Sequence, residues 1–247
     1  MSVVEIAREG EVAVLRLNRP EKLNAISSEM ERRLHEALAS DLVRTSGAVV
    51  VAGEGRAFSA GADISEFEGR SPEDVLRYYH ETGGVYEELA ALPQPTVAAI
   101  HGYCLGGALE LALALDFRIA DETAVFGFPE VSLGILASSG GLHRATRFVG
   151  PARAKELFLL AERFGADDAR RTGVVTEVVA EGKALERALE MAGRLAALPR
   201  DAVAVTKQAI DAAGTAPREA ALLIERLAYA ALAQTQAAKD AAAGFGS

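Results

Sequence analysis

The sequence is poor in residues that build cross-links or metal sites. It holds one cysteine, Cys104, and its histidines, His35, His80, His101 and His143, show no metal-ligand spacing. A single cysteine cannot form an internal disulfide or supply a cysteine-based zinc cluster. A reducing compartment is the simple interpretation, and we expect a cytoplasmic protein without a bound metal.

Positive charge is also scarce, with 26 Lys and Arg against 35 Asp and Glu, a net charge of −9 and a pI near 5.1. A general nucleic-acid binder would carry a basic face, so we expect no nucleic-acid partner. An anionic ligand would need a local basic patch, because the overall field would repel it.

Long hydrophobic runs are missing as well. The longest, residues 109–115, contains Glu110 and is far shorter than the ~20 apolar residues that span a bilayer. Charges interrupt the first ten residues, so we expect neither a targeting segment nor a membrane partner.

Strand and helix patterns alternate through most of the chain. Residues 3–7 and 12–17 alternate around Gly10 like a hairpin, and the apolar runs 47–52 and 96–100 predict buried strands. Shorter strands are predicted at 117–120, 124–128 and 174–179, and helices at 27–40, 71–92, 141–149 and 152–161, with a further helix opened by Gly106 and Gly107.

From about Glu181 the pattern is helical and rich in alanine, with Pro199 and Pro217 between helices. Mixed strands and helices therefore come first and helices alone come last. We predict an α/β core over residues 1–190, which would hold the site, and a helical region over 191–247.

Two glutamates stand in apolar surroundings. Glu110 follows Gly106 and Gly107 in a helical run of leucine and alanine, and Glu130 lies in Phe-Gly-Phe-Pro-Glu-Val. Burying a carboxylate raises its pKa or costs several kcal/mol. Brought together, two such acids could perform general acid–base chemistry near neutral pH. Taken singly, either could face solvent or pair with an arginine.

Loops of small residues follow the two predicted buried strands, at residues 58–64 and 102–107. We interpret both as strand-to-helix junctions, where a helix start presents free backbone N–H groups. Side by side, two such groups could stabilise a developing oxyanion. Tight packing between strand and helix would demand the same small residues.

Four segments, in this order, resemble the enoyl-CoA hydratase/isomerase (crotonase) superfamily. They read Leu-Asn-Arg-Pro-Glu-Lys-Leu-Asn-Ala (17–25), Phe-Ser-Ala-Gly-Ala-Asp-Ile (58–64), Gly-Tyr-Cys-Leu-Gly-Gly-Ala-Leu-Glu-Leu-Ala (102–112) and Phe-Gly-Phe-Pro-Glu-Val-Ser-Leu-Gly (126–134). The resemblance implies an α/β spiral of strand-strand-helix (ββα) turns with a C-terminal helical trimerisation region, assembled as a homotrimer or homohexamer.

The resemblance also implies an acyl-CoA thioester substrate, in which coenzyme A is part of the substrate and no separate cofactor is needed. By motif position, the catalytic pair falls on Glu110 and Glu130 and the oxyanion hole on the N–H groups of Ala62 and Gly107. The substrate- and CoA-binding positions are Lys22, Leu23, Ala25, Ala60, Gly61, Asp63, Ile64, Gly106, Pro129 and Gly134.

With both acids present, the resemblance favours hydration of a 2-enoyl-CoA to a 3-hydroxyacyl-CoA, by syn addition of water. We expect Glu110 to activate water and Glu130 to deliver the proton to C2. Relatives that only shift double bonds often lack an acid at position 110, yet one carboxylate can also shuttle a proton, so isomerisation or another acyl-CoA lyase reaction stays open.

The chain departs from the common pattern at two places. Residues 134–145 read Gly-Ile-Leu-Ala-Ser-Ser-Gly-Gly-Leu-His-Arg-Ala, where relatives often have Gly-Ile-Ile-Pro-Gly-Ala-Gly-Gly-Thr-Gln-Arg-Leu. This loop lies beside the acyl pocket in the family, so the acyl preference is left open. The chain also ends in Gly-Phe-Gly-Ser, without the basic ending that often touches CoA phosphates.

Other interpretations remain to be tested. Ala-Phe-Ser-Ala-Gly (57–61) resembles an incomplete nucleophile elbow, which would make Ser59 a hydrolase nucleophile. A non-catalytic binding protein is a remote alternative. Tyr78, Tyr79 and Tyr86 lie on the helix predicted near the substrate entrance, where they serve either packing or the substrate.

Overall fold

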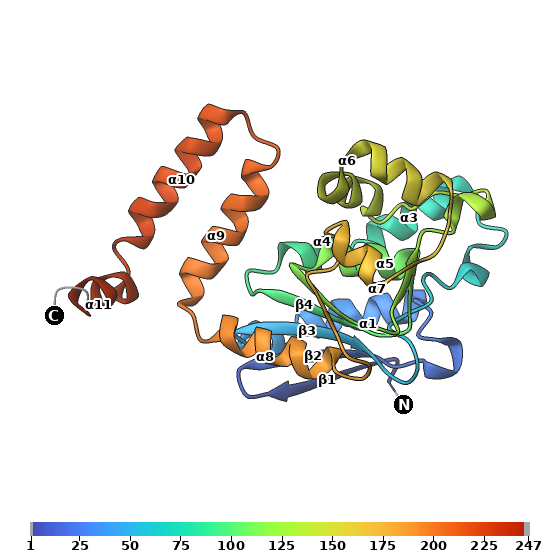
Figure 1. Cartoon of the computed structure of the whole chain (residues 1–247), viewed down its shortest axis with the longest axis horizontal. Helices are drawn as coiled ribbons and strands as arrows, with labels where there is room; N and C mark the ends of the chain where they lie inside the picture. Colours follow the sequence, from blue (N-terminus) through green and yellow to red (C-terminus); the bar gives the residue numbers. More distant parts are fainter. Residues whose placement is uncertain (1, 245–247) are drawn as a thin grey trace.

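Six strands form the main sheet in the computed structural model, which describes residues 2–244 (Figure 1). Their order across the sheet is β1-β2-β3-β4-β6-β9. The bounds are β1 Val4–Glu9, β2 Val12–Leu17, β3 Ala48–Gly53, β4 Thr96–Ile100, β6 Phe117–Asp121 and β9 Glu177–Val179. The first pair is an antiparallel hairpin, as predicted, and every later neighbour is parallel.

A second, three-stranded sheet has the order β5-β7-β8, with β5 Tyr103–Leu105, β7 Val125–Gly127 and β8 Phe164–Gly165. β4 is followed by β5 and α5, and β6 by β7 and α6, so each turn places its first strand in the large sheet and its second in the small one. This repeat is the predicted ββα spiral. Strands β5 and β8, which the sequence did not predict, have two or three residues each, too few for a periodic pattern.

Helices cover the sheet and form the end of the chain. Their bounds are α1 Ser28–Leu38, α2 Asp41–Arg44, α3 Pro72–Glu81, α4 Val85–Ala91, α5 Gly107–Ala114, α6 Gly141–Leu159, α7 Ala166–Arg171, α8 Ala184–Ala196, α9 Arg200–Ala213, α10 Arg218–Leu232 and α11 Gln236–Gly244. Ser27 caps α1 by accepting the Met30 N–H, and Ser71 forms a capping box on α3, which are roles that serine favours at helix N-termini.

The single helix predicted over residues 71–92 is wrong, because the chain breaks between α3 and α4. The N–H groups of Thr82 and Gly83 both donate hydrogen bonds to the Tyr78 carbonyl, and α3 ends there. A Cβ at Gly83 would lie 2.8 Å from the Tyr79 ring. A glycine is therefore needed where the chain turns back against its own tyrosine. The two helices predicted at 141–149 and 152–161 both lie within α6, where Gly150, with the non-helical φ of 75° and ψ of 163°, separates them ahead of Pro151.

The last helices divide into one that packs on the sheet and three that do not. Ala184, Ala188 and Ala192, spaced four residues apart, bury one face of α8 against the strands. Figure 1 shows α9, α10 and α11 extending away from the body. The predicted division at residue 190 falls inside α8, and the helices leave the body only after Pro199.

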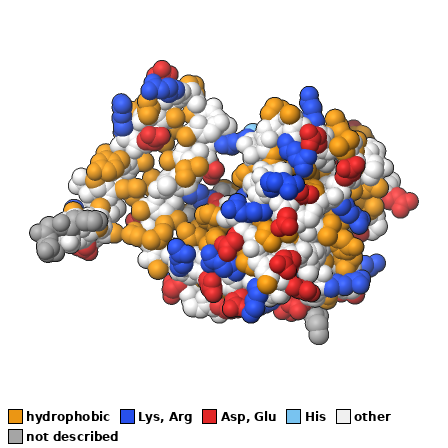
Figure 2. Space-filling model, viewed as in Figure 1, with side chains coloured by type: hydrophobic (Ala, Val, Ile, Leu, Met, Phe, Trp, Pro, Cys, Tyr) orange, Lys and Arg blue, Asp and Glu red, His pale blue; other side chains and the backbone are white. Residues whose placement is uncertain are grey.

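Apolar side chains gather on the projecting helices. Figure 2 shows them along α9 and α10. Those most exposed are Ile210, Leu223, Leu227 and Tyr229, each more than half accessible. No helix within residues 2–244 is long and apolar enough to cross a membrane. The unusual Gly-Phe-Gly-Ser ending lies, after Gly244, outside the described residues.

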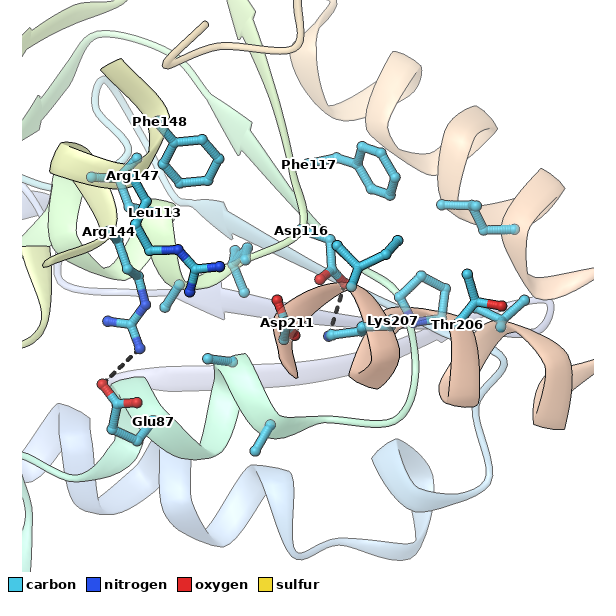
Figure 3. A pocket seen from close by; sticks show the side chains of 18 of the residues that line it. Glu87, Leu113, Asp116, Phe117, Arg144, Arg147, Phe148, Thr206, Lys207 and Asp211 are labelled. Carbon is cyan, nitrogen blue, oxygen red and sulfur yellow. Dashed lines mark hydrogen bonds and ion pairs between the residues drawn. The ribbon is translucent and has the colours of Figure 1, made fainter. Parts of the chain in front are cut away.

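A cavity of about 1010 Å³ separates α9 from the body (Figure 3). Leu113, Phe117 and Phe148 line it together with two ion pairs, Arg144 with Glu87 at 2.6 Å and Lys207 with Asp116 at 2.9 Å. Neither Glu110 nor Glu130 belongs to its lining. This cavity and the acid pair are therefore separate features of the molecule.

Candidate active site

Glu110 is buried on the first turn of α5 and held by a neighbouring loop. The residue is only 3% exposed, and its Oε1 accepts hydrogen bonds from the N–H groups of Ser139 and Gly141, each at 2.8 Å. Burial raises the pKa of Glu110, while these N–H bonds oppose the rise. The sequence could not predict this loop contact, because the residues lie about thirty positions apart.

Glu130 begins the short 3-10 helix η3, Glu130–Leu133, which follows β7 after Phe128 and Pro129. It is 9% exposed, and its Oε2 has no hydrogen-bond partner within the described part of the chain. Burial raises the pKa of Glu130 to about 7, and the nearby charge of Glu110 adds to the rise. A carboxyl with an unsatisfied oxygen and this pKa can give or take a proton near neutral pH.

The two acids meet because β5 and β7 are neighbours in the small sheet. Leu105 pairs with Gly127 across parallel strands, and the Gly106 N–H donates to the Gly127 carbonyl at 2.9 Å. Glu110 follows the first strand and Glu130 the second, so both emerge at the same end of the sheet. A Cβ at Gly106 would lie 2.7 Å from the Glu130 Oε1. The glycine at position 106, with φ 52°, leaves room for that carboxyl.

Two backbone amides lie beside this pair. A Cβ on Gly107 would lie 3.3 Å from the Ala62 nitrogen, so the two residues are in contact. Among residues 2–244, no hydrogen-bond acceptor is recorded for the N–H of Ala62 or of Gly107. Gly61, with φ 104°, packs against the Leu105 carbonyl and brings the segments together. Both donors of the predicted oxyanion hole are thus adjacent and unpaired.

One of the two predicted helix junctions is wrong. Gly107 opens α5, as expected, but the segment after Ala62 forms only the 3-10 turn η2, Ile64–Phe67. A parallel bridge between Ile26 and Ala62, with the Asp63 N–H donating to the Ile26 carbonyl, fixes this loop instead. Loop pairing, rather than a helix terminus, therefore leaves the Ala62 amide free.

The loop predicted to bind CoA lies against the loop that carries Ala62. The Ala60 N–H donates to the Leu23 carbonyl at 2.9 Å, and the Ile26 N–H donates to the Gly61 carbonyl at 2.8 Å. The buried Asn24 amide donates to the carbonyls of Glu54 and Ala57, both at 2.8 Å. Leu23 and Asn24 adopt the left-handed conformation with φ of 51° and 54°, a conformation that asparagine tolerates. Asn24 ties the two loops together, and the sequence did not predict this role.

The remaining predicted positions surround these two loops and the acid pair. Arg19 Nη1 binds the Ala25 carbonyl at 2.7 Å and Asp63 at 3.2 Å, so both are fixed in place. Lys22 and Ile64 are exposed, the latter at 57%. Pro129 lies next to Gly106, where an added Cβ would contact its side chain. Gly134 ends η3 with φ 76° and has open space around it.

Ser59 does not have the geometry of a nucleophile. It is fully buried. Its Oγ donates a hydrogen bond to the Asn24 carbonyl at 2.8 Å and accepts one from the Gly61 N–H at 3.2 Å. These contacts give the hydroxyl a structural role within the two loops. Within residues 2–244, no cluster of histidine, cysteine, aspartate or glutamate has the arrangement of a metal site.

The chain is similar in sequence and in fold to known enoyl-CoA hydratases. A sequence model of the enoyl-CoA hydratase/isomerase family matches residues 7–246. A probable enoyl-CoA hydratase of Rhizobium meliloti is 39% identical over 97% of this chain and 93% of its own length. A short-chain-enoyl-CoA hydratase of Clostridium acetobutylicum is 36% identical over 98% and 94%.

Among solved structures, enoyl-CoA hydratase subunit I of Geobacillus kaustophilus has a TM-score of 0.91 at 34% identity, covering 99% of this chain and 95% of the other. The likeness therefore extends over the ββα spiral and the C-terminal helices alike. Fold, motif order and sequence identity agree: this chain belongs to the enoyl-CoA hydratase/isomerase family.

Proposed function

We propose that this protein is an enoyl-CoA hydratase, which adds water across the 2,3 double bond of a 2-enoyl-CoA thioester to give a 3-hydroxyacyl-CoA. The observation that carries the proposal is the pair of buried acids, Glu110 and Glu130, beside the unpaired amides of Ala62 and Gly107. The relatives' names support the same reaction.

The thioester oxygen gains negative charge as C2 takes on enolate character. Two backbone N–H groups directed at that oxygen would stabilise it, and each such donor contributes about 3 kcal/mol to the transition state. Glu110, held by two N–H groups, is suited to the ionised state that takes a proton from water. Glu130, with its unpaired oxygen and raised pKa, is suited to the protonated state that donates to C2. Both roles belong to one coupled pair.

The CoA portion would occupy the two adjoining loops. One loop contributes Lys22, Leu23 and Ala25 to the CoA site. The other contributes Ala60, Gly61, Asp63 and Ile64. The exposed Lys22 ammonium supplies a local positive charge for CoA phosphates on an otherwise acidic protein. Coenzyme A is part of the substrate, so the reaction calls for no separate cofactor. The buried, unpaired Cys104 supports a reducing, cytoplasmic location.

A panel of purified 2-enoyl-CoA thioesters tests the proposal. We expect the protein to hydrate at least one short straight-chain member, measured by loss of the enoyl-thioester absorbance and by mass identification of the 3-hydroxyacyl-CoA. The same panel should include 3-enoyl-CoA substrates. Turnover of these alone, with no hydrated product, would identify an isomerase and contradict the proposal.

The rate of hydration should follow a bell-shaped pH profile. Activity requires ionised Glu110 and protonated Glu130, so it rises with pH as the first acid loses its proton and falls as pH passes the second pKa, at about 7. The measurement is kcat against pH with a short enoyl-CoA. Replacing Glu130 by glutamine should remove the alkaline limb along with most of the activity, whereas a rate that keeps rising above pH 8 would contradict the assigned roles.

The projecting helices are proposed to assemble the protein into a trimer or a pair of trimers. Leu223 and Leu227 on α10, 56% and 62% exposed, lie four residues apart and so share one helix face. Replacing both by glutamate should convert the assembly to monomers in analytical ultracentrifugation. Ile6→Glu, at an exposed apolar residue of β1, is the control and should leave the assembly intact. Unchanged sedimentation of the double variant would show that this face is not the interface.

A further inference from the structure

Two adjacent tyrosines on α3 lie between the loop that holds Glu110 and a third buried acid. Consecutive helical residues point about 100° apart, so Tyr78 and Tyr79 reach different neighbours. The Tyr78 hydroxyl donates to Glu31 Oε1 at 2.5 Å, and the Tyr79 hydroxyl is hydrogen-bonded to Ser138 Oγ. Their rings meet edge to face at 5.0 Å. Helix α3 is therefore bonded on one side to α1 and on the other to the loop after η3.

The Tyr79 contact is one residue away from a group that holds Glu110. Ser138 precedes Ser139, whose N–H donates to Glu110 Oε1 at 2.8 Å, and Gly141 donates to the same oxygen. Ser138 is exposed, and Ile135 and Leu136 are more than half accessible, whereas Ala137 between them and Ser138 packs in the core. Ala137 therefore supplies the apolar contact of this stretch, and the Tyr79 hydroxyl adds a polar contact to α3.

The other end of this connection is firmly held. Glu31 is 1% exposed, and its Oε2 has no hydrogen-bond partner within residues 2–244. Burial raises the pKa of Glu31 to about 7, against the lowering effect of its Tyr78 bond. Loss of the Tyr78 bond would leave both oxygens of this buried acid without a partner, which costs free energy. Tyr78 thus fixes α3 against α1, and this contact holds the neighbouring Tyr79 within hydrogen-bonding distance of Ser138.

We propose that Tyr79 is a positioning residue for Glu110, acting through Ser138 to hold the loop whose backbone N–H groups orient and stabilise the Glu110 carboxylate. The inference rests on the proposed function, because it takes Glu110 as the base for water. Tyr79 acts on the position and charge of that base and need not touch the substrate.

The test compares Tyr79→Phe, Ser138→Ala and the double variant with crotonyl-CoA as substrate. Each single change should lower kcat about tenfold, equivalent to about 1.4 kcal/mol, with KM within about twofold. The acidic limb of the kcat–pH profile should move to higher pH, because weaker N–H bonds leave the carboxylate less stabilised. The double variant should resemble the singles, since both remove one contact.

Tyr103→Phe is the matched control, since this half-buried tyrosine lies on β5 with its ring against Arg163. It should leave kcat and both pH limbs unchanged. If Tyr79→Phe fails to fold, Ser138→Ala decides, because it truncates an exposed side chain. Wild-type kcat and an unmoved acidic limb in these variants, with activity lost in Glu110→Gln, would overturn this inference alone. Retained activity in Glu110→Gln would instead overturn the proposed function on which it rests.

Discussion

Glutamine at position 110 or 130 is expected to lower kcat for hydration by about 10²–10⁴-fold, the usual contribution of a general acid or base. Glutamine keeps the size of the side chain and can still accept the N–H bonds of Ser139 and Gly141, but it cannot exchange the proton. Both variants should therefore fold and bind substrate. The measurement is kcat and KM with a short enoyl-CoA, together with the melting temperature.

Glu177→Gln provides the control, because this acid lies on β9 and pairs with Arg187 at 2.9 Å, away from the site. Its kcat should match the wild type. Full hydration activity in either site variant would show that the acid pair has been wrongly assigned. Loss of hydration in Glu110→Gln with a retained double-bond shift would mean that Glu130 alone supports isomerisation.

Alanine at position 141 is expected to lower kcat about 100-fold. A Cβ there would overlap Cγ of Glu110 and lie 2.7 Å from its Oε1 and 2.9 Å from its Cδ. Because Glu110 is 3% exposed and surrounded by packed residues, its carboxylate cannot move aside without losing its N–H donors, and misplacement by about 1 Å can cost 10²-fold in rate. KM should change less, since the CoA loops lie on other segments.

Gly193→Ala is the matched control. It lies inside α8 with nothing within 4 Å of the added Cβ, so kcat should not change. The fold should gain roughly 0.5–1 kcal/mol, because alanine suits a helix interior better than glycine. Steady-state kinetics and thermal unfolding of both variants decide the matter. Wild-type kcat in Gly141→Ala would mean that Glu110 has more freedom than its surroundings suggest.

Local signals were sufficient for most long elements. The hairpin, the buried runs that became β3 and β4, the serine caps of α1 and α3 and the helical C-terminal quarter all follow from periodicity and capping residues. The prediction of secondary structure was wrong where contacts with other parts of the chain determine the local conformation. Gly83 breaks a helical pattern because the chain turns against the Tyr79 ring, and strands of two or three residues carry no period.

The sequence alone indicated the chemistry of this protein, because four motifs resemble one family and place Glu110 and Glu130 in apolar runs, where a buried acid must be paired or change its pKa. Only the tertiary structure decided how these acids are held. Pairing of β5 with β7 brings them to one end of a sheet, and the Ser139 and Gly141 amides reach Glu110 from a distant loop. Such contacts depend on which segments pack together, and local residue preferences do not encode that.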